Sequence, residues 1–251
     1  SGFAIDIEKL RASITEKTTV LVYNNYQNPI CAASSQEEVE ALAELALEHD
    51  LWVLSDDAYY EIRYTDEPPR SIVNISGMQE RTLILYTFSK KFAMTGWRVG
   101  ASIGPAEVIK HIARFNINDE SCTNHFIQHA LAETVGGDPS GANELLYELQ
   151  TRRDETIKGL NAIEGIHVPT PESTFYSYPN VTGVMAEKGF TDLDKFRTAA
   201  LESTGVSFCA RHHFGTPLAG ETDHYIRLAY SGISQDDIRE GLGKLKTWIE
   251  G

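Results

Sequence analysis

Three short, almost uninterrupted apolar runs constrain the fold of this chain most strongly. They occupy residues 19–23, 51–54 and 82–86 and are rich in β-branched and aromatic side chains. A strand with one solvated face alternates apolar and polar residues, whereas continuous runs are typical of strands buried on both faces of a parallel sheet. Between the first two runs lies a helical pattern that begins with the capping-box pair Ser35 and Glu38. Strand, helix and strand in this order predict an α/β fold with a mostly parallel sheet.

The rest of the chain predicts further helices and then a smaller mixed region. A short lead-in helix is expected within residues 3–18, and later helical patterns cover 107–116, 125–135, 143–160, 193–203 and 238–249. Strand-like runs occur near the end, at 175–178, 206–209 and 225–230. We therefore expect two domains. Residues 1–155 form part of a large domain and include the long connecting helix, and residues 156–251 form a small α+β domain.

Composition excludes several classes of protein. The chain has 251 residues, of which 41% are hydrophobic, enough for a substantial core. No run of about eighteen uncharged apolar residues occurs, so we expect no membrane span. The formal net charge of −14 argues against a nucleic-acid partner.

Cysteine and histidine usage indicate a reduced protein without a metal site. Cys31, Cys122 and Cys209 are widely separated and show no Cys-x-x-Cys spacing, which favours a cytoplasmic location. His212 and His213 are the only adjacent histidines, and no carboxylate lies at ligand spacing from them. We therefore predict no metal.

The polar residues that follow the third run have the chemistry of a cofactor loop. Ligands bind beyond the carboxyl ends of parallel strands, and just there the chain places Thr87, Ser89 and Lys90. Hydroxyl groups meet phosphate oxygens, and a lysine amine forms a Schiff base with a carbonyl. Arg98 adds a planar fork suited to phosphate. These features together indicate pyridoxal phosphate, with an ordinary surface loop as the alternative.

The ends of the other two runs supply matching groups at the same edge of the sheet. Pyridoxal phosphate acts as an electron sink when its ring nitrogen stays protonated, and a neighbouring carboxylate raises the pKa of that nitrogen. Asp56 follows the second run and would supply it. Tyr59 and Asn28 are suitable hydrogen-bond donors to the phenolate oxygen of the ring. A cis peptide before Pro29 is left open by the sequence.

These motifs resemble a known family. The string from Thr87 through Lys90 to Gly96-Trp97-Arg98 is similar to the lysine signature of the class I/II pyridoxal-phosphate aminotransferases of fold type I, the aspartate aminotransferase superfamily. Asn28-Pro29 and the segment that contains Asp56 and Tyr59 resemble two further motifs of that family. The resemblance implies that Lys90 is the catalytic lysine bound covalently to the cofactor. It also implies phosphate contacts from Thr87, Ser89 and Arg98, with Lys91 as a bystander.

Arg227 is a charged residue inside an apolar strand-like run. Burying it unpaired would be expensive, so it is expected to face an anion, with a structural salt bridge as the alternative. Tyr225-Ile226-Arg227-Leu228 resembles the family segment whose arginine clamps the substrate α-carboxylate, and Asn28 would also contact the substrate. No arginine lies in residues 118–128, so a dicarboxylate preference is not supported, although Arg114 and Arg211 keep it open.

The resemblance implies reversible amino transfer between an L-amino acid and a 2-oxo acid by a ping-pong mechanism, within amino acid metabolism. It also implies a homodimer. One alternative is a pyridoxal-phosphate-dependent β-lyase, because fold does not fix chemistry. Another is a non-enzymatic, cofactor-binding effector domain of a regulator.

The resemblance covers only the later part of the family pattern. We therefore expect a fragment that needs a missing N-terminal segment or a complementary chain and that need not be active alone. Ile30-Cys31 and Asp57 replace the usual Thr-Gly and Glu of the family, which puts the subfamily in doubt more than the chemistry.

Overall fold

The computed structural model describes residues 3–251. These residues form two compact units. The first comprises Phe3–Gln27 and Ala32–Leu145, and the second comprises Asn28–Cys31 and Leu146–Gly251. The second unit therefore includes four residues from a loop in the first part of the chain. The expected domain boundary after residue 155 stays a prediction.

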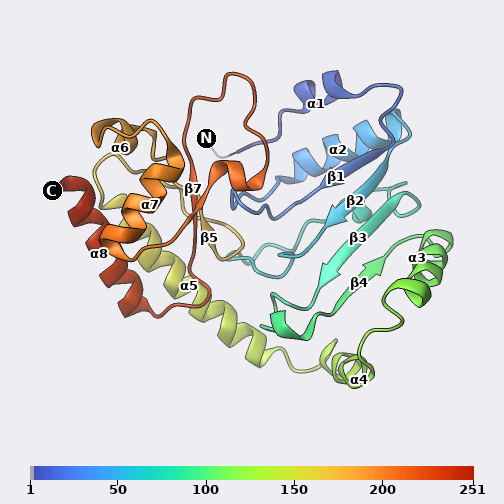
Figure 1. Cartoon of the computed structure of the whole chain (residues 1–251). Coiled ribbons are helices and arrows are strands. Elements are labelled where there is room, and N and C mark those ends of the chain that lie inside the picture. The colour runs from blue at the N-terminus through green and yellow to red at the C-terminus, as the bar shows by residue number, and fades with distance from the viewer. Residues whose placement is uncertain (1–2) are drawn as a thin grey trace. The chain divides into compact units, whose positions relative to one another are not determined.

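The first unit contains a four-stranded sheet of order β1 (Val20–Tyr23), β2 (Trp52–Asp56), β3 (Thr82–Thr87) and β4 (Gly100–Ile103) (Figure 1). The first three strands pair in parallel, and β4 pairs antiparallel to β3. The α/β fold with a mostly parallel sheet is thus confirmed. Sequence reasoning missed β4, because its four residues include a single β-branched side chain and begin with glycine.

Helices and turns complete the first unit. They are α1 (Ile7–Ser13), α2 (Gln36–Glu48), η1 (Ile72–Asn74), η2 (Thr95–Trp97), α3 (Ala106–Asp119) and α4 (His125–Thr134). The capping box of α2 is present, since the Ser35 hydroxyl accepts the Glu38 amide and the Glu38 carboxylate accepts the Ser35 amide. The lead-in helix is shorter than the span in which it was expected. No helix among the described residues is long and apolar enough to cross a membrane.

The two faces of the sheet differ in burial. Apolar residues of α2, such as Val39 and Leu42, share a core with Tyr23 and Val53 on one face. The opposite face carries exposed apolar side chains, with exposed fractions of 38–69%, at Val20, Val22, Trp52 and Leu85. The strand register places these four on one face. The expectation of strands buried on both faces is therefore met on one face only within residues 3–251.

The second unit is a small antiparallel sheet packed against helices. The sheet has the order β5 (Tyr176–Ser177), β7 (Ile226–Ala229) and β6 (Cys209–Ala210). The other elements are α5 (Ser140–Asn161, whose first residues belong to the first unit), α6 (Thr182–Glu187), α7 (Leu193–Thr204), η3 (Arg211–Phe214) and α8 (Gln235–Glu250). Sequence reasoning missed α6 and made all three strands too long. β6 begins only at Cys209, three residues after the predicted start, and it ends at Ala210, where the chain turns into η3.

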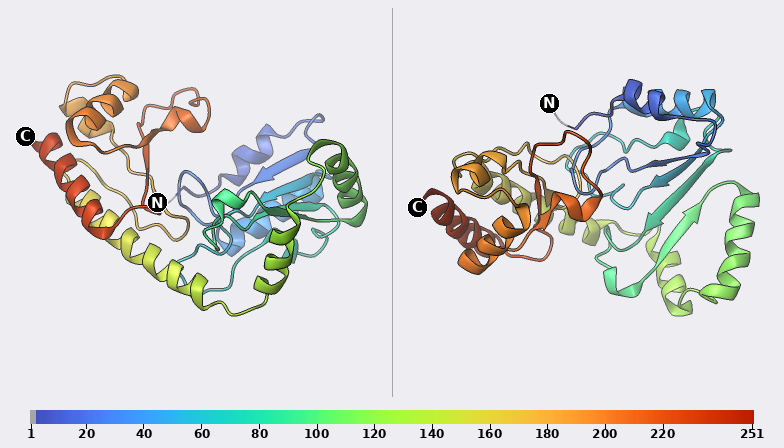
Figure 2. Two further views of the ribbon diagram at one scale, coloured as in Figure 1. Left: turned by 60° about the horizontal axis from the view of Figure 1, so that its bottom comes forward. Right: turned by 45° about the horizontal axis from the view of Figure 1, so that its top comes forward.

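α5 and α8 lie side by side (Figure 2), and Gly159 of α5 faces Leu242 of α8. A Cβ atom added at Gly159 of α5 would lie 2.5 Å from Cδ1 and 3.2 Å from Cβ of Leu242 in α8. Leu242 is buried in the core of this unit together with Leu160, Phe196 and Leu245. Gly159 therefore allows the two helices to approach closely.

This contact predicts opposite effects for two Gly→Ala substitutions. Alanine is favoured over glycine in a helix by about 1 kcal/mol, yet Gly159→Ala should lower the free energy of unfolding by about 1–3 kcal/mol through overpacking. Gly243→Ala in α8 is the matched control, because nothing lies within 4 Å of its added Cβ. It should raise the free energy of unfolding by about 0.5–1 kcal/mol. Urea denaturation followed by circular dichroism measures both. Equal stabilisation by the two variants would contradict the packing argument.

Candidate functional site

Two adjacent aspartates at the end of β2 have different environments. Asp57 is 5% exposed and accepts a hydrogen bond of 2.7 Å from the Ser55 hydroxyl. Burial raises the pKa of the Asp57 carboxyl above its usual value. Asp56 is half-buried and accepts bonds from the Ala58 amide (3.2 Å) and the Asn24 side-chain amide (3.4 Å). Asp56 forms no ion pair within residues 3–251, so its charge is available to a ligand.

Two adjacent lysines after β3 also differ. Lys91 Nζ pairs with Glu61 Oε2 at 2.7 Å, and the Tyr86 hydroxyl donates to the same Glu61 oxygen at 3.0 Å. Lys90 Nζ instead lies 5.4 Å from the ring centroid of Tyr59, which is buried. Lys91 thus has a structural carboxylate partner, whereas Lys90 faces the aromatic ring that follows β2.

The hydroxyl and arginine residues predicted to hold phosphate lie around the turn between β3 and β4. The Ser89 amide donates to Thr87 Oγ1 at 3.2 Å, and Ser89 is buried. The Phe88 amide donates to the Val99 carbonyl, which brings the residue beside Arg98 next to this turn. Arg98 is exposed, has a left-handed backbone with φ of 50°, and donates to the Thr95 carbonyl at 3.0 Å. A non-glycine residue in this conformation is strained, and such residues cluster at functional sites.

The residues that the first unit gathers fit a phosphorylated aldehyde on a basic ring. Within residues 3–251, the sheet places a carboxylate without an ion-pair partner at the end of β2 and a hydroxyl at the end of β3, and a second hydroxyl, an amine and an arginine follow β3. Phosphate takes hydrogen bonds from hydroxyl and guanidinium groups, and a carboxylate favours a protonated ring nitrogen. The individual roles of Asp56, Tyr59, Thr87, Ser89, Lys90 and Arg98 stay predictions.

The second unit brings Arg227 and Asn28 together. Arg227 Nη1 donates to Asn28 Oδ1 at 2.7 Å, and Nη2 lies 3.7 Å from Cys209 Sγ. The guanidinium carbon lies 4.2 Å from the ring centroid of Tyr176 and 4.6 Å from that of Phe214. Arg227 Nε is buried without a hydrogen-bond partner, and Arg227 forms no ion pair with a carboxylate among residues 3–251. The peptide between Asn28 and Pro29 is cis.

The sequence did not predict that three further residues contact the Arg227 side chain. The rings of Tyr176 and Phe214 lie close to the guanidinium, and Cys209 is the residue of β6 paired with Arg227. The register between the strands decides these contacts, and the sequence gives no signal for it. Arg211, which keeps a dicarboxylate preference open in the sequence, is paired with a carboxylate of the chain itself. Its Nε and Nη2 bind Glu221 at 2.8 and 3.0 Å.

The buried Asp57 predicts a pH-dependent stability difference. Its pKa is higher in the folded chain than the ordinary 3.8, because burial disfavours the charge. Between the ordinary pKa of 3.8 and the higher pKa of the folded chain, the folded state therefore binds more protons than the unfolded state. The contribution of Asp57 to the free energy of unfolding thus falls as the pH rises. Asp57→Asn keeps an oxygen for the Ser55 hydroxyl and carries no charge. Calorimetry should show that this variant melts at a higher temperature than wild type at pH 7. The difference between the two melting temperatures should become smaller toward pH 4. A difference that widens on acidification would contradict this account.

Comparison with known proteins adds to this geometry. A model of the family described as aminotransferase class I and II matches residues 1–245. The chain is 31% identical over 249 residues to an asparagine–oxo-acid transaminase of Streptococcus mutans, and 35% identical over 233 residues to an aspartate aminotransferase of Musicola paradisiaca. These alignments cover 99% and 93% of this chain but 62% and 56% of those proteins.

A solved structure also matches nearly all of this chain and about three fifths of its own length. The aromatic aminotransferase from Pyrococcus horikoshii matches with a TM-score of 0.89 at 29% identity. The match covers 98% of this chain and 64% of that one. The chain thus spans about three fifths of the length of the proteins that it resembles.

Proposed function

We propose that this chain is part of an enzyme that transfers an amino group between an L-amino acid and a 2-oxo acid. The reason is that the chain belongs to the aminotransferase class I and II family. The family depends on pyridoxal phosphate, and its fold type I agrees with the α/β architecture described above. The relatives named above are called transaminases or aminotransferases, and none is called a lyase or a regulator.

One observation carries the proposal. Asp56 and Arg227 each lack a partner of opposite charge within residues 3–251, whereas neighbouring charged residues such as Lys91 and Arg211 are paired. A partly buried charge without a partner is costly unless a ligand compensates it. Asp56 suits a protonated ring nitrogen, and Arg227 suits a carboxylate. A cofactor with a basic ring and an amino acid substrate would supply these two counter-charges.

The cofactor residues can be assigned from their chemistry. When bound, pyridoxal phosphate supplies an electron sink for the pair of electrons released at the substrate α-carbon. Asp56 would raise the pKa of the ring nitrogen and keep it protonated. Thr87, Ser89 and Arg98 would hold the phosphate. Tyr59 and Asn28 would each donate to the phenolic oxygen of the ring.

Lys90 would both fix the cofactor and move a proton. Its amine would condense with the cofactor carbonyl with loss of water, and as a free amine it would act as a base. In that second role Nζ would accept a proton from the substrate α-carbon. Lys91 is unsuited to this task because Glu61 holds its amine at 2.7 Å.

Arg227 would bind the α-carboxylate of the amino acid. A guanidinium presents parallel N–H groups that match a carboxylate bidentately. The ring centroids of Tyr176 and Phe214 lie 4.2 and 4.6 Å from its guanidinium carbon, and Nη1 donates to the Asn28 amide oxygen at 2.7 Å. The arginine is thus oriented before the substrate arrives. Asn28 would contact the substrate as well as the cofactor.

The assembly and location are further parts of the proposal. We propose a cytoplasmic homodimer that acts in amino acid metabolism, in agreement with the free state of Cys31, Cys122 and Cys209. Exposed apolar side chains on a mostly parallel sheet indicate a surface that is covered in the assembled enzyme. The cover would be the part of the family sequence that lies outside the matched stretch, or a complementary chain.

The lysine assignment predicts a covalent label at one position. Incubation of the chain with pyridoxal phosphate, borohydride reduction and peptide mass spectrometry should place the adduct on Lys90. Lys90→Arg should lose this adduct, because arginine cannot form the covalent bond. Lys91→Arg is the matched control and should keep it. An adduct spread over surface lysines in equal yield for both variants would contradict the assignment.

A further inference from the structure

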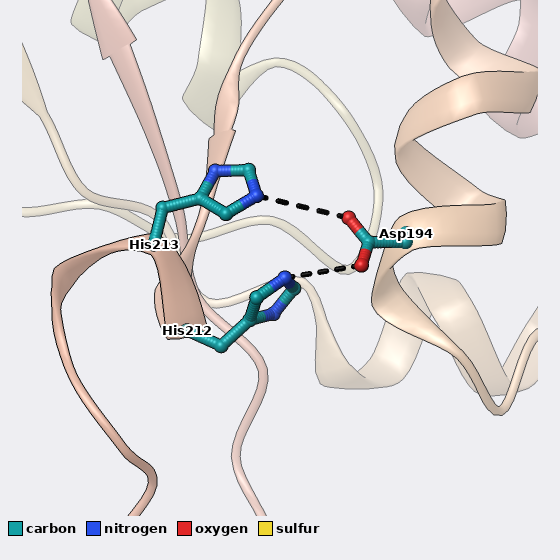
Figure 3. A group of neighbouring side chains, drawn as sticks. All are labelled: Asp194, His212 and His213. Carbon is teal, nitrogen blue, oxygen red and sulfur yellow. Dashed lines mark ion pairs between the residues drawn. The ribbon is translucent and has the colours of Figure 1, made fainter.

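Three side chains of the second unit converge away from the residues discussed above. Asp194 lies in the first turn of α7, and His212 and His213 lie in η3 (Figure 3). Nε2 of His212 is 3.0 Å from Asp194 Oδ2, and Nε2 of His213 is 3.9 Å from Oδ1. One donor atom from each residue lies within 4.8 Å of the other two. The side chains are 50%, 37% and 39% exposed, so an ion can reach them.

We propose that Asp194, His212 and His213 bind a divalent transition-metal ion of the zinc class. Metal–nitrogen and metal–oxygen bonds of about 2.0–2.1 Å at tetrahedral angles place donor atoms about 3.3 Å apart. The separations of 3.0 and 3.9 Å run to the two different oxygens of Asp194, and the one-donor-per-residue set lies within 4.8 Å, so small movements of these exposed side chains bring the donors to this spacing. Two imidazoles and one carboxylate suit Zn²⁺, Co²⁺ or Ni²⁺ better than Mg²⁺ or Ca²⁺. Three protein ligands leave the fourth position to water.

The surroundings of the cluster hold the carboxylate and favour a cation. Arg197 Nε donates to Asp194 Oδ1 at 3.2 Å, which orients the carboxylate as an outer-shell partner does in metal sites. Asp194 and His212 also line a hollow of about 380 Å³ whose wall includes three further carboxylates, those of Asp192, Glu221 and Asp223. Arg197 opposes a cation, while Arg211 is neutralised by Glu221. Carboxylates therefore outnumber cationic groups around the cluster.

The sequence did not suggest this site because its carboxylate comes from a different element. His212 and His213 have no acidic residue at ligand spacing along the chain. Asp194 reaches them only because α7 and η3 pack against each other in the folded unit. The earlier prediction of no metal rested on local spacing alone.

A hydrogen bond in the metal-free chain competes with the metal. The Ala210 amide donates to His213 Nδ1 at 3.2 Å, so the neutral ring carries its proton on Nε2. A metal on Nε2 requires the proton on Nδ1, and that proton excludes the Ala210 bond. Loss of one such bond weakens metal binding by roughly fivefold. Metal binding should therefore switch the tautomer of His213 and shift the Ala210 amide.

A second histidine pair must be removed before this site is measured. His125 and His129 lie one turn apart on α4, with ring centroids 4.7 Å from each other, and such a pair chelates the same ions. The untagged double variant His125→Ala/His129→Ala is thus the reference protein. Zn²⁺ binding to it is measured by isothermal titration calorimetry at pH 7.5. Co²⁺ absorption in the same protein reports the coordination number.

The proposal predicts one Zn²⁺ per chain in the reference protein. His212→Ala and Asp194→Asn, each added to that background, should weaken binding at least tenfold. ¹⁵N spectra of labelled histidine in the reference protein should show His213 changing from the Nε2–H to the Nδ1–H tautomer on Zn²⁺ addition. This readout needs no variant of the site. Unchanged affinity in both variants, or an unchanged His213 tautomer at saturating Zn²⁺, would overturn the proposal.

Discussion

Parallel pairing of β1, β2 and β3 is the constraint on which the candidate cofactor site depends. Parallel strands run in one direction, so the residues that follow each strand emerge at the same edge of the sheet. Asp56 is paired in register with Leu85 of β3, two residues before Thr87 and the lysine loop. A slip of one residue would exchange the faces of Asp56 and Asp57 and bury the carboxylate that is now accessible. The register therefore decides which of the two aspartates can meet a ligand.

Charge compensation separates structural charged residues from the candidate ligand-binding ones in this chain. Lys91 and Arg211 each have a carboxylate partner at less than 3 Å, and both reinforce the fold. Arg227 has aromatic rings, an amide oxygen and a thiol around it but no carboxylate among residues 3–251. The surroundings orient the guanidinium without neutralising it. Such an arrangement leaves its electrostatic attraction to an incoming carboxylate intact.

The sequence predicts the local parts of this account well. Continuous apolar runs indicate the parallel strands, and the spacing of Ser35 and Glu38 indicates the start of α2. It predicts contacts between distant segments poorly, because these depend on register and packing. The antiparallel β4, the burial of Asp57, and the grouping of Asn28–Cys31 with the second unit all depend on such contacts. The convergence of Asp194 with His212 and His213 is of the same kind.

The central claim is that the charges left unpaired by the fold are the ones that bind the substrate and the cofactor. A steady-state amino-transfer assay of Arg227→Lys in the assembled enzyme tests it most directly, with Arg239→Gln as the matched control because Arg239 pairs with Glu155 on the surface. Lysine keeps the charge but loses the bidentate fork, so kcat/KM should fall about 10- to 100-fold, mostly through a higher KM. Arg239→Gln should leave it unchanged. An equal kcat/KM in Arg227→Lys and wild type would contradict the claim.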